Sequence, residues 1–359
     1  MKFQNSTIPQ LNFHNKEMGM KLPEFEYVEP KSIRKACQLL KEKGEKAEAI
    51  AGGTDLMMAL KNRLKVPEML VDLRGLSHLN RINYSEKEGL KVGALVSLRQ
   101  LSGSAVVQEK YPILSRAALD VGTPQLQAMG TVGGNLCQDN LCLYYHRSPM
   151  LRQRLEPCHK LGGDICHAVS RSKICWASYC GDIAPVLLVY QASVKIVDSR
   201  GEKIIPLNKF YSGNGKKPNI LKPGQIITEI QVPVPSPHSG GAYLKFRLRK
   251  TIDYPLLGVA VNLTMDSSGE STGQICKHAA LALTAVERAP ILIEEADELK
   301  GKKLSDAFVE KLAGAAYTHA HPLNNICELT PQYRKDLVRV YVKLAAQDAL
   351  QWATKGEGA

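Results

Sequence analysis

The chain has 359 residues, of which 44% are hydrophobic and 23% are charged. This length and composition allow two or three buried cores, and they exclude a disordered polypeptide or a small disulfide-rich domain. No apolar run approaches the roughly 18 to 20 residues that a membrane span needs, and the first ten residues lack the basic and apolar regions of a signal peptide. We therefore expect a cytoplasmic protein whose cysteines are buried thiols or metal ligands.

Lysine and arginine outnumber the acidic residues by 47 to 35, which gives a formal net charge of +12. Such a charge suits nucleic acid, a membrane surface or an acidic protein partner. Aromatic residues make up only 6% of the chain, and the basic residues are spread along it instead of forming an aromatic-rich ribbon. We therefore expect no nucleic-acid partner.

Regular structure is predicted to begin near Phe25, after a polar N-terminal arm at residues 1–21. Short apolar strands then alternate with amphipathic helices. The predicted strands are 25–28, 47–51, 69–73 and 90–92, and the predicted helices are 31–43, 56–60, 97–107 and 112–121. This order predicts a small α/β unit at the N-terminal end of the fold.

Two glycine-rich turns interrupt this pattern, one at residues 51–55 and the other at residues 130–135. A Gly-Gly pair removes two Cβ atoms, so successive backbone N–H groups can approach phosphate oxygens. Asp55 and Asn135 follow the two turns and could cap a helix or reach a ribose or ribityl hydroxyl. Neither turn has the fingerprint of a Rossmann or P-loop site, and each alone could be an ordinary tight turn.

Residues 137–180 lose all apolar periodicity and contain six of the nine cysteines. The six are Cys137, Cys142, Cys158, Cys166, Cys175 and Cys180. Four thiolates can hold a 4Fe-4S cluster, and gaps of 5, 16, 8, 9 and 5 between these cysteines suit a loop wrapped around an object larger than a single zinc ion. Zinc and simple packing of buried thiols are the alternatives. His146, His159 and His167 lie in the same segment and are expected to hydrogen-bond cluster sulfur or backbone, and Trp176 to anchor the loop.

Ordinary patterning resumes after the cysteine-rich segment. A helix is predicted at 183–189 and a strand at 194–197, with a hairpin at Gly201. The Pro- and Gly-rich run at 233–241 is the predicted domain boundary. Beyond it, strands are predicted at 242–248, 258–265 and 278–283, and helices at 307–320 and 331–352. The last domain should therefore be α+β.

Four motifs occur in a characteristic order. They are Ala51-Gly52-Gly53-Thr54-Asp55, Thr131-Val132-Gly133-Gly134-Asn135, Asp182 with Pro185, and Lys245-x3-Arg249-x3-Asp253. Over about residues 22–352, this pattern resembles the FAD-binding middle subunit of the xanthine dehydrogenase and carbon monoxide dehydrogenase family of molybdenum hydroxylases. One branch of that family, typified by the 4-hydroxybenzoyl-CoA reductase β subunit, carries a 4Fe-4S cluster on cysteines spaced by 16, 8 and 9. Cys142, Cys158, Cys166 and Cys175 have the same spacing.

The resemblance implies an α+β fold with two domains. A vanillyl-alcohol-oxidase-like FAD-binding domain of two α/β subdomains would occupy residues 22–237, with the 4Fe-4S insertion at about 138–181. A C-terminal α+β domain of the CO dehydrogenase flavoprotein type would occupy residues 238–359. Cys137 and Cys180 fall outside the implied ligand set and are expected to be packing residues.

The resemblance also implies which residues face the FAD. The first turn, Ala51, Gly52, Gly53, Thr54 and Asp55, would hold the pyrophosphate, and Thr131, Gly133, Gly134 and Asn135 would line the opposite side. Asp182 and Lys245 would contact the flavin or its ribityl and phosphate region. The alternatives for these two are a helix N-cap for Asp182 and a solvated strand end for Lys245.

As a member of this family, the chain would transfer electrons and would not bind the organic substrate. A large molybdenum-cofactor subunit and a small subunit with two 2Fe-2S clusters are the implied partners, in a dimer of heterotrimers, with a ferredoxin as the external electron partner. Reductive dehydroxylation of an aromatic acyl-CoA is the expected reaction of the complex. The alternatives are an oxidative molybdenum hydroxylase that exports electrons, or a zinc-stabilised basic nucleic-acid-binding protein.

The loop between Cys142 and Cys175 carries a surplus of four positive charges. Its basic residues are Arg147, Arg152, Arg154, Lys160, Arg171 and Lys173, against Glu156 and Asp164. These charges either form a docking face for an acidic ferredoxin or offset the charge of the thiolates. On the docking interpretation, Arg152 and Arg154 should be exposed.

Overall fold

The computed structural model describes residues 22–266, 275–303, 305–324 and 329–355, so the expected N-terminal arm at residues 1–21 lies outside the described part. Within these ranges, five short 3-10 helices lie between the main elements: η1 (Gly44–Lys46), η2 (Ser77–Leu79), η3 (His159–Leu161), η4 (Leu207–Lys209) and η5 (Glu294–Leu299). In these described residues, no helix has both the length and the apolarity that crossing a membrane requires.

A three-stranded parallel sheet begins the fold, in the strand order β1-β3-β2. Its strands are β1 (Glu26–Val28), β2 (Ala47–Ile50) and β3 (Met69–Asp72), and the crossovers contain α1 (Ile33–Lys43) and α2 (Leu56–Lys61). α1 begins where the Ser32 hydroxyl accepts a hydrogen bond from the Lys35 amide, and it ends at Gly44, whose φ of +57° suits glycine. The predicted small α/β unit is confirmed.

The second sheet has five antiparallel strands in the order β4-β5-β8-β6-β7. They are β4 (Ile82–Ser85), β5 (Gly89–Gly93), β6 (Ser193–Val197), β7 (Glu202–Pro206) and β8 (Ile226–Val232). Between β5 and β6, the chain forms six helices that belong to this subdomain: α3 (Leu98–Gly103), α4 (Ala105–Lys110), α5 (Pro112–Leu119), α6 (Pro124–Met129), α7 (Val132–Leu136) and α9 (Ile183–Val189). The single helix predicted at 97–107 is divided into α3 and α4, because Ser104 adopts an extended conformation.

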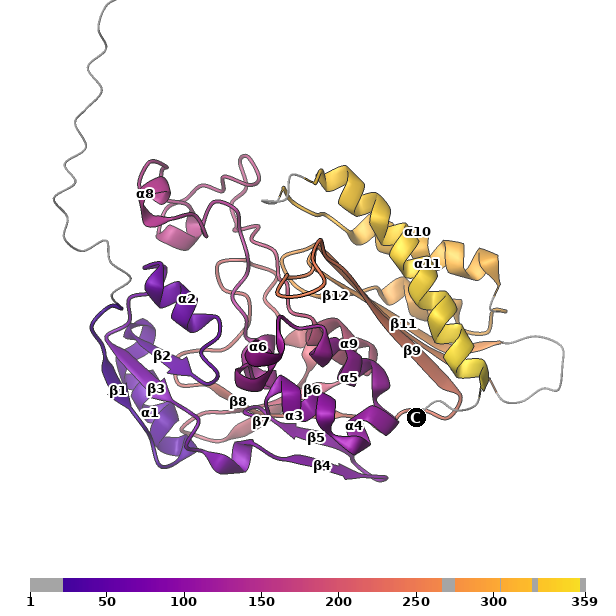
Figure 1. Cartoon of the computed structure of the whole chain (residues 1–359), viewed down its shortest axis with the longest axis horizontal. Coiled ribbons are helices and arrows are strands. Elements are labelled where there is room, and N and C mark those ends of the chain that lie inside the picture. The colour runs from indigo at the N-terminus through magenta and orange to yellow at the C-terminus, as the bar shows by residue number, and fades with distance from the viewer. Residues whose placement is uncertain (1–21, 267–274, 304, 325–328, 356–359) are drawn as a thin grey trace, which may run out of the picture.

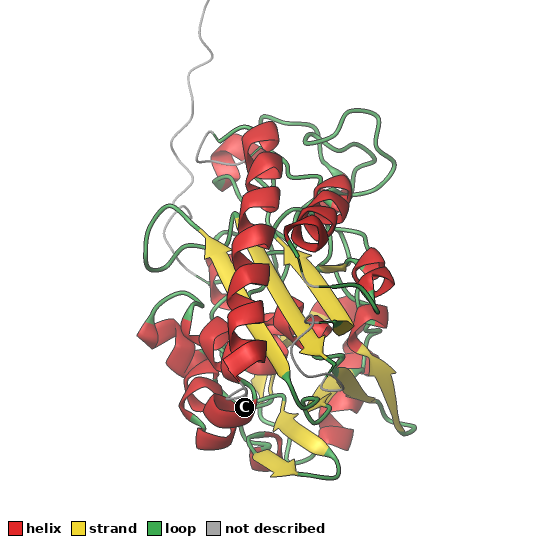
Figure 2. Ribbon diagram, turned by 90° about the vertical axis from the view of Figure 1, so that its right-hand side faces the viewer, coloured by secondary structure: helices red, strands yellow, loops and turns green. Residues whose placement is uncertain are grey.

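The C-terminal sheet has four antiparallel strands in the order β12-β11-β10-β9. They are β9 (Ser239–Phe246), β10 (Leu257–Met265), β11 (Cys276–Thr284) and β12 (Ile291–Leu292), followed by α10 (Asp306–His319) and α11 (Pro331–Lys355). α10 and α11 cover one face of this sheet (Figure 2), while α9 packs against β10 and β11. The fold class predicted for this part, α+β, is confirmed.

Residues along β10 alternate between two cores, as the period of a strand requires. Val259 and Val261 point into the core shared with α10 and α11, whereas Ala260 joins the core that contains α9. The second core continues into the five-stranded sheet, because Val194 and Ile230 belong to it. The C-terminal sheet is therefore enclosed by helices of both halves of the chain.

The cysteine-rich insertion projects from the fold next to α2 (Figure 1) and contains only α8 (Pro149–Arg152) and η3. The Tyr145 hydroxyl donates a hydrogen bond to the Leu64 carbonyl just after α2. On the other side, the Asn140 amide donates to the carbonyls of Ala177 and Arg288. The insertion is thus held between the first subdomain and the C-terminal half.

Candidate functional site

The first glycine turn, residues 51–55, connects β2 to α2. Gly53 has a φ of +71°, and a Cβ atom on Gly52 would lie 1.9 Å from the Met129 carbonyl oxygen, so both positions require glycine. Within the described residues, the backbone N–H groups of Gly52, Gly53, Thr54 and Asp55 donate to no protein acceptor. This turn therefore presents four unused donors on a half-buried surface.

The second turn, residues 130–135, is bonded within the protein. Thr131 caps α7 by accepting a hydrogen bond from the Gly134 amide at 3.1 Å, and the Gly133 amide donates to the Ala94 carbonyl at 2.9 Å. A Cβ atom on Gly133 would lie 2.8 Å from the Ala94 side chain, so this glycine allows α7 to pack on the preceding loop. Gly134 is exposed and Asn135 is half-buried, whereas the other residues of this turn are buried.

The two glycine turns lie side by side, as their sequence motifs cannot show. Gly52 contacts the backbone of Met129, and Thr54 Oγ1 lies 3.7 Å from the position of a Cβ atom on Gly130. Asn135, at the end of the second turn, accepts a long hydrogen bond of 3.5 Å from the Ile183 amide. The two turns expected on opposite sides of the FAD are thus in contact with each other.

Asp182 and Lys245 form a buried ion pair, with their side chains 4% and 2% exposed and 3.0 Å between Lys245 Nζ and Asp182 Oδ1. The Tyr243 hydroxyl donates to the same carboxylate at 2.7 Å, and Lys245 also donates to the Asp120 carbonyl at 2.8 Å. Burial raises the pKa of Asp182 to about 6, while Lys245 and Tyr243 act in the opposite direction.

Both alternative interpretations of this pair are wrong. Asp182 makes no side-chain cap on α9, and Lys245 is not solvated. Asp182 comes directly before α9, and Lys245 lies on β9. Their contact joins the two halves of the chain. That the pair contacts the FAD stays a prediction.

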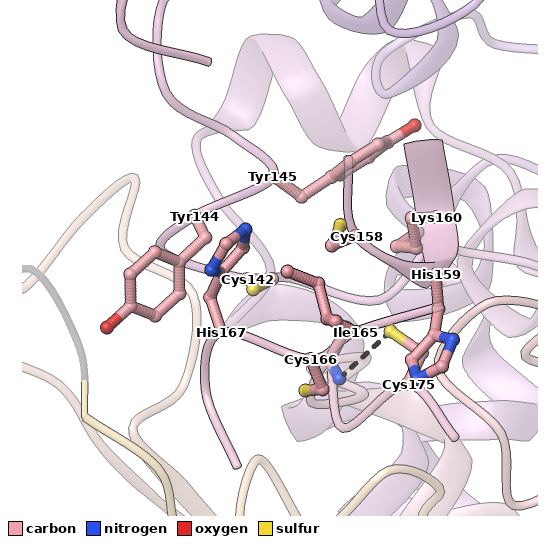
Figure 3. Close-up of a pocket in the computed structure, with 11 residues that line it drawn as sticks. Cys142, Tyr144, Tyr145, Cys158, His159, Lys160, Ile165, Cys166, His167 and Cys175 are labelled. Carbon is pink, nitrogen blue, oxygen red and sulfur yellow. Dashed lines mark hydrogen bonds between the residues drawn. The ribbon is translucent and has the colours of Figure 1, made fainter. Parts of the chain in front are cut away.

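Cys142, Cys158, Cys166 and Cys175 line one cavity in the insertion (Figure 3). The cavity is small, with a volume of about 10 Å³, and Tyr144, Tyr145 and Lys160 also line it. Cys137 and Cys180 are not in its lining. Among the described residues, no three Cys, His, Asp or Glu side chains meet closely enough to hold a single metal ion.

The three histidines of the insertion bond to backbone, as expected from the sequence. The ring of His146 lies 3.2 Å from the amide and the carbonyl of Cys142, that of His159 lies 3.0 Å from the Ser172 carbonyl, and that of His167 lies 2.8 Å from the Glu156 carbonyl. Each contact connects residues 4 to 13 positions apart. They hold together a loop that has almost no regular structure.

Trp176 fixes the end of the insertion, in agreement with its predicted anchoring role. Its indole N–H donates to Ser172 Oγ at 2.8 Å, and the Arg288 guanidinium lies 4.2 Å from the ring centre. Because Arg288 follows β11, this contact attaches the insertion to the C-terminal half.

Two of the basic residues expected on a docking face are buried instead. Arg152 is 9% exposed and donates hydrogen bonds of 2.6 Å to the carbonyls of Arg147 and Asn62. The Lys160 side chain is 4% exposed and bonds to Asp139. The prediction that Arg152 is available to a partner is wrong, because this residue fastens α8 to the end of α2. Arg154, Arg171 and Lys173 are exposed.

Two family models match the chain. The FAD binding domain in molybdopterin dehydrogenase matches residues 23–235, and the CO dehydrogenase flavoprotein C-terminal domain matches residues 242–349. The chain belongs to the FAD-binding medium subunits of the molybdenum hydroxylase family. It is therefore a subunit of an oxidoreductase, and the alternative of a zinc-stabilised nucleic-acid-binding protein is wrong.

Individual relatives agree with this assignment. The carbon monoxide dehydrogenase medium chain of Afipia carboxidovorans is 30% identical over 326 residues, which are 90% of this chain and 96% of that one. The aldehyde oxidoreductase FAD-binding subunit of Escherichia coli is 33% identical over 268 residues, which are 70% and 78% of the two chains. The solved CO dehydrogenase from Oligotropha carboxidovorans has a TM-score of 0.75 and 28% identity, covering 92% of this chain and 99% of that chain.

The structure of this medium subunit adds Tyr254 to the candidate FAD site. Its hydroxyl donates to the Asp55 carboxylate at 3.1 Å, which brings the loop after β9 to the first glycine turn. Burial raises the pKa of Asp55, and the Tyr254 hydrogen bond acts against that rise. Sequence patterns could not have linked these residues, because they are 199 positions apart and Tyr254 belongs to no periodic element.

Proposed function

We propose that this medium subunit binds FAD and a 4Fe-4S cluster, and that it transfers electrons within a molybdenum enzyme resembling 4-hydroxybenzoyl-CoA reductase. The main support for this proposal is that one cavity is lined by four cysteines that are up to 33 residues apart in the sequence, Cys142, Cys158, Cys166 and Cys175. Four thiols distributed around one space are the donor set that a cubane cluster requires. Packing thiols without a metal are the alternative, which the iron and sulfide content of the complex distinguishes.

The residues of the two turns suit an FAD pyrophosphate. The unused N–H groups of residues 52–55 would donate to its oxygens. The hydrogen bond from the Gly134 amide to Thr131 fixes the second glycine turn beside them. Asp55 would be positioned by Tyr254 beside the bound cofactor. When bound, the flavin supplies both one-electron and two-electron chemistry, which connects a two-electron substrate reaction to single-electron carriers.

Partner subunits follow from the family. Relatives carry names such as medium chain, FAD-binding subunit and dehydrogenase complex subunit, so they are parts of larger assemblies. We propose a large molybdenum-cofactor subunit and a small 2Fe-2S subunit as partners, in a dimer of heterotrimers. A ferredoxin would dock at the exposed basic residues of the insertion, Arg154, Arg171 and Lys173.

The cofactor content of the purified complex tests the proposal. We expect about four irons and four acid-labile sulfides per medium subunit, beyond those of the small subunit. Cys158→Ser or Cys166→Ser should remove this iron and leave FAD in place, because the cavity and the glycine turns are separate. Cys37→Ala and Cys276→Ala are the controls, since both thiols are buried outside the insertion. Zinc in place of iron, or iron loss only when Cys137 and Cys180 are replaced, would contradict the ligand assignment.

FAD content is tested separately by Gly53→Val and Gly134→Val. Gly53 has positive φ, so a branched side chain strains the turn that holds the free amides. A Cβ atom on Gly134 would lie 2.9 Å from Thr131 Oγ1, so a branched side chain there disturbs the second turn. We expect both variants to bind less FAD and to retain iron. Gly201→Val is the control, because a Cβ atom there meets nothing within 4 Å. Full FAD occupancy in folded variants would show that these turns do not hold the cofactor.

An oxidative molybdenum hydroxylase is the second candidate. The names of the relatives favour it, because they include carbon monoxide dehydrogenase and aldehyde oxidoreductase. The two candidates differ in the direction of electron flow, which activity assays of the purified complex measure. Consumption of 4-hydroxybenzoyl-CoA with a reduced low-potential donor supports the reductive enzyme. Reduction of an electron acceptor by an aldehyde or N-heteroaromatic substrate, without that consumption, supports the oxidative one.

A further inference from the structure

Lys160 holds a buried cation next to the four cysteines. It lines their cavity (Figure 3), its side chain is 4% exposed, and it lies two positions after Cys158. The ammonium group lies 4.7 Å from the centre of the Tyr145 ring, and it donates to the Asp139 carboxylate and, at 3.2 Å, to the Asn140 carbonyl. Three partners thus fix a charge that is costly to bury.

Asp139 lies between Lys160 and the candidate FAD site. It comes four positions after Asn135 and three before Cys142, so it lies between the second glycine turn and the first cysteine of the cavity. The Asp139 side chain is 31% exposed. Its charge also reaches the first turn, since it contributes, after burial, to the raised pKa of Asp55.

We propose that Lys160 sets the reduction potential of the iron–sulfur cluster, and that Asp139 holds Lys160 in place and offsets part of its charge. This inference rests on the proposed cluster at the four cysteines. Reduction by one electron makes a thiolate-bound cluster one unit more negative. A fixed ammonium in a water-poor site stabilises that form more than the oxidised form, so it raises the potential. Lys160 is a positioning residue in this scheme and ligates nothing.

Two substitutions should shift the potential in opposite directions. Lys160→Met removes the positive charge while it keeps the length of the side chain, and should lower the potential of the cluster. Asp139→Asn removes the negative charge and keeps the shape, and should raise it. Lys160→Arg retains the charge and should stay near the wild-type value. A purely structural role for the pair would not produce shifts of opposite sign.

Lys173→Met is the matched control. Lys173 also lies two positions from a cysteine of the cavity, Cys175, but it is exposed and does not line the cavity. Its substitution should shift the potential less than Lys160→Met does, because water and salt screen an exposed charge.

The experiment is a redox titration of the holo complex with dithionite, followed by the electron paramagnetic resonance signal of the reduced cluster, with iron and sulfide measured for every variant. A wild-type complex without the additional iron and sulfide refutes the proposed cluster itself. Additional iron with equal potentials in wild type, Lys160→Met and Asp139→Asn refutes the role of Lys160 alone. If Lys160→Met and Lys160→Gln both lose iron, Lys160 serves to fold the loop, and the inference is overturned.

Discussion

At the scale of single residues, Asp182 carries a buried carboxyl group whose side chain is 4% exposed. Its ion pair with Lys245 and its hydrogen bond from Tyr243 satisfy both oxygens, yet burial still raises its pKa to about 6. Above that pH the charged carboxylate is held in the interior by these two partners alone. The pair is therefore sensitive both to pH and to the loss of either partner.

Asp182 should make stability depend on pH in a defined direction. Because its folded-state pKa lies above its ordinary value, the folded chain binds a proton that the unfolded chain releases between pH of about 4 and about 6. Stability should fall as pH rises through this window and level off above it. Across this window, the free energy of unfolding of the wild type should fall by on the order of 2 to 3 kcal/mol relative to that of Asp182→Asn, since each pKa unit corresponds to about 1.4 kcal/mol.

Urea unfolding of both proteins at several pH values between 4 and 7 measures this difference. The Asn variant removes the titrating group and keeps the shape of the side chain, so only the difference between the two curves is interpreted. Parallel curves would show that Lys245 keeps Asp182 ionised throughout the window.

At the scale of elements, the insertion depends on a few contacts with its neighbours. α8 has only four residues, too short to be stable alone. Arg152, at its last position, donates to the Arg147 carbonyl within the insertion and to the Asn62 carbonyl at the end of α2. One guanidinium thus fixes both the shape of the loop and its position on the first subdomain.

We expect Arg152→Met to loosen the insertion. Two carbonyls lose their charged donor, and each such hydrogen bond contributes about 1.5 to 3 kcal/mol. Limited proteolysis should then cut within residues 148–156 faster than in the wild type, while FAD content is unchanged. Arg154→Met is the matched control, because Arg154 is two residues away and exposed. Equal cleavage rates in the two variants would show that the insertion is held mainly by its other contacts.

At the scale of the whole molecule, the FAD-binding domain and the C-terminal domain both contribute residues to one hydrophobic core. Ala260, Ala280 and Ala282 of the C-terminal sheet belong to the same core as Leu187 of α9. The Asp182–Lys245 pair and the backbone hydrogen bonds between Tyr179 and residues 285 and 287 cross the same boundary. A Pro- and Gly-rich linker between two domains therefore does not make them independent here.

The chain should consequently unfold in one thermal transition. The apolar surface of the C-terminal sheet that faces α9 would be exposed if either half unfolded alone, which couples the two halves. Differential scanning calorimetry of the FAD-loaded subunit should show one peak with equal calorimetric and van't Hoff enthalpies. Two resolved peaks, or release of a folded fragment after cleavage near residues 233–238, would contradict this expectation.

Local sequence determined much about this protein. The alternation of strands and helices predicted the first α/β unit and the C-terminal α+β domain, because both rest on periodic burial along the chain. The order of the glycine and charged motifs was enough to indicate the family, which the two matching family models confirm. The family resemblance, through the cysteine spacing, grouped Cys142, Cys158, Cys166 and Cys175, and all four line one cavity.

Tertiary structure alone decided what those residues touch. Gly52 needs to be glycine because of the Met129 carbonyl, 77 positions away, and Gly133 because of Ala94. Asp182 and Lys245 became partners of each other, and Arg152 turned inward although its neighbours Gln153 and Arg154 stayed exposed. The physical reason is that periodicity and spacing describe one segment at a time. Burial, close backbone approach and the pairing of charges depend on which distant segments the packed core brings together.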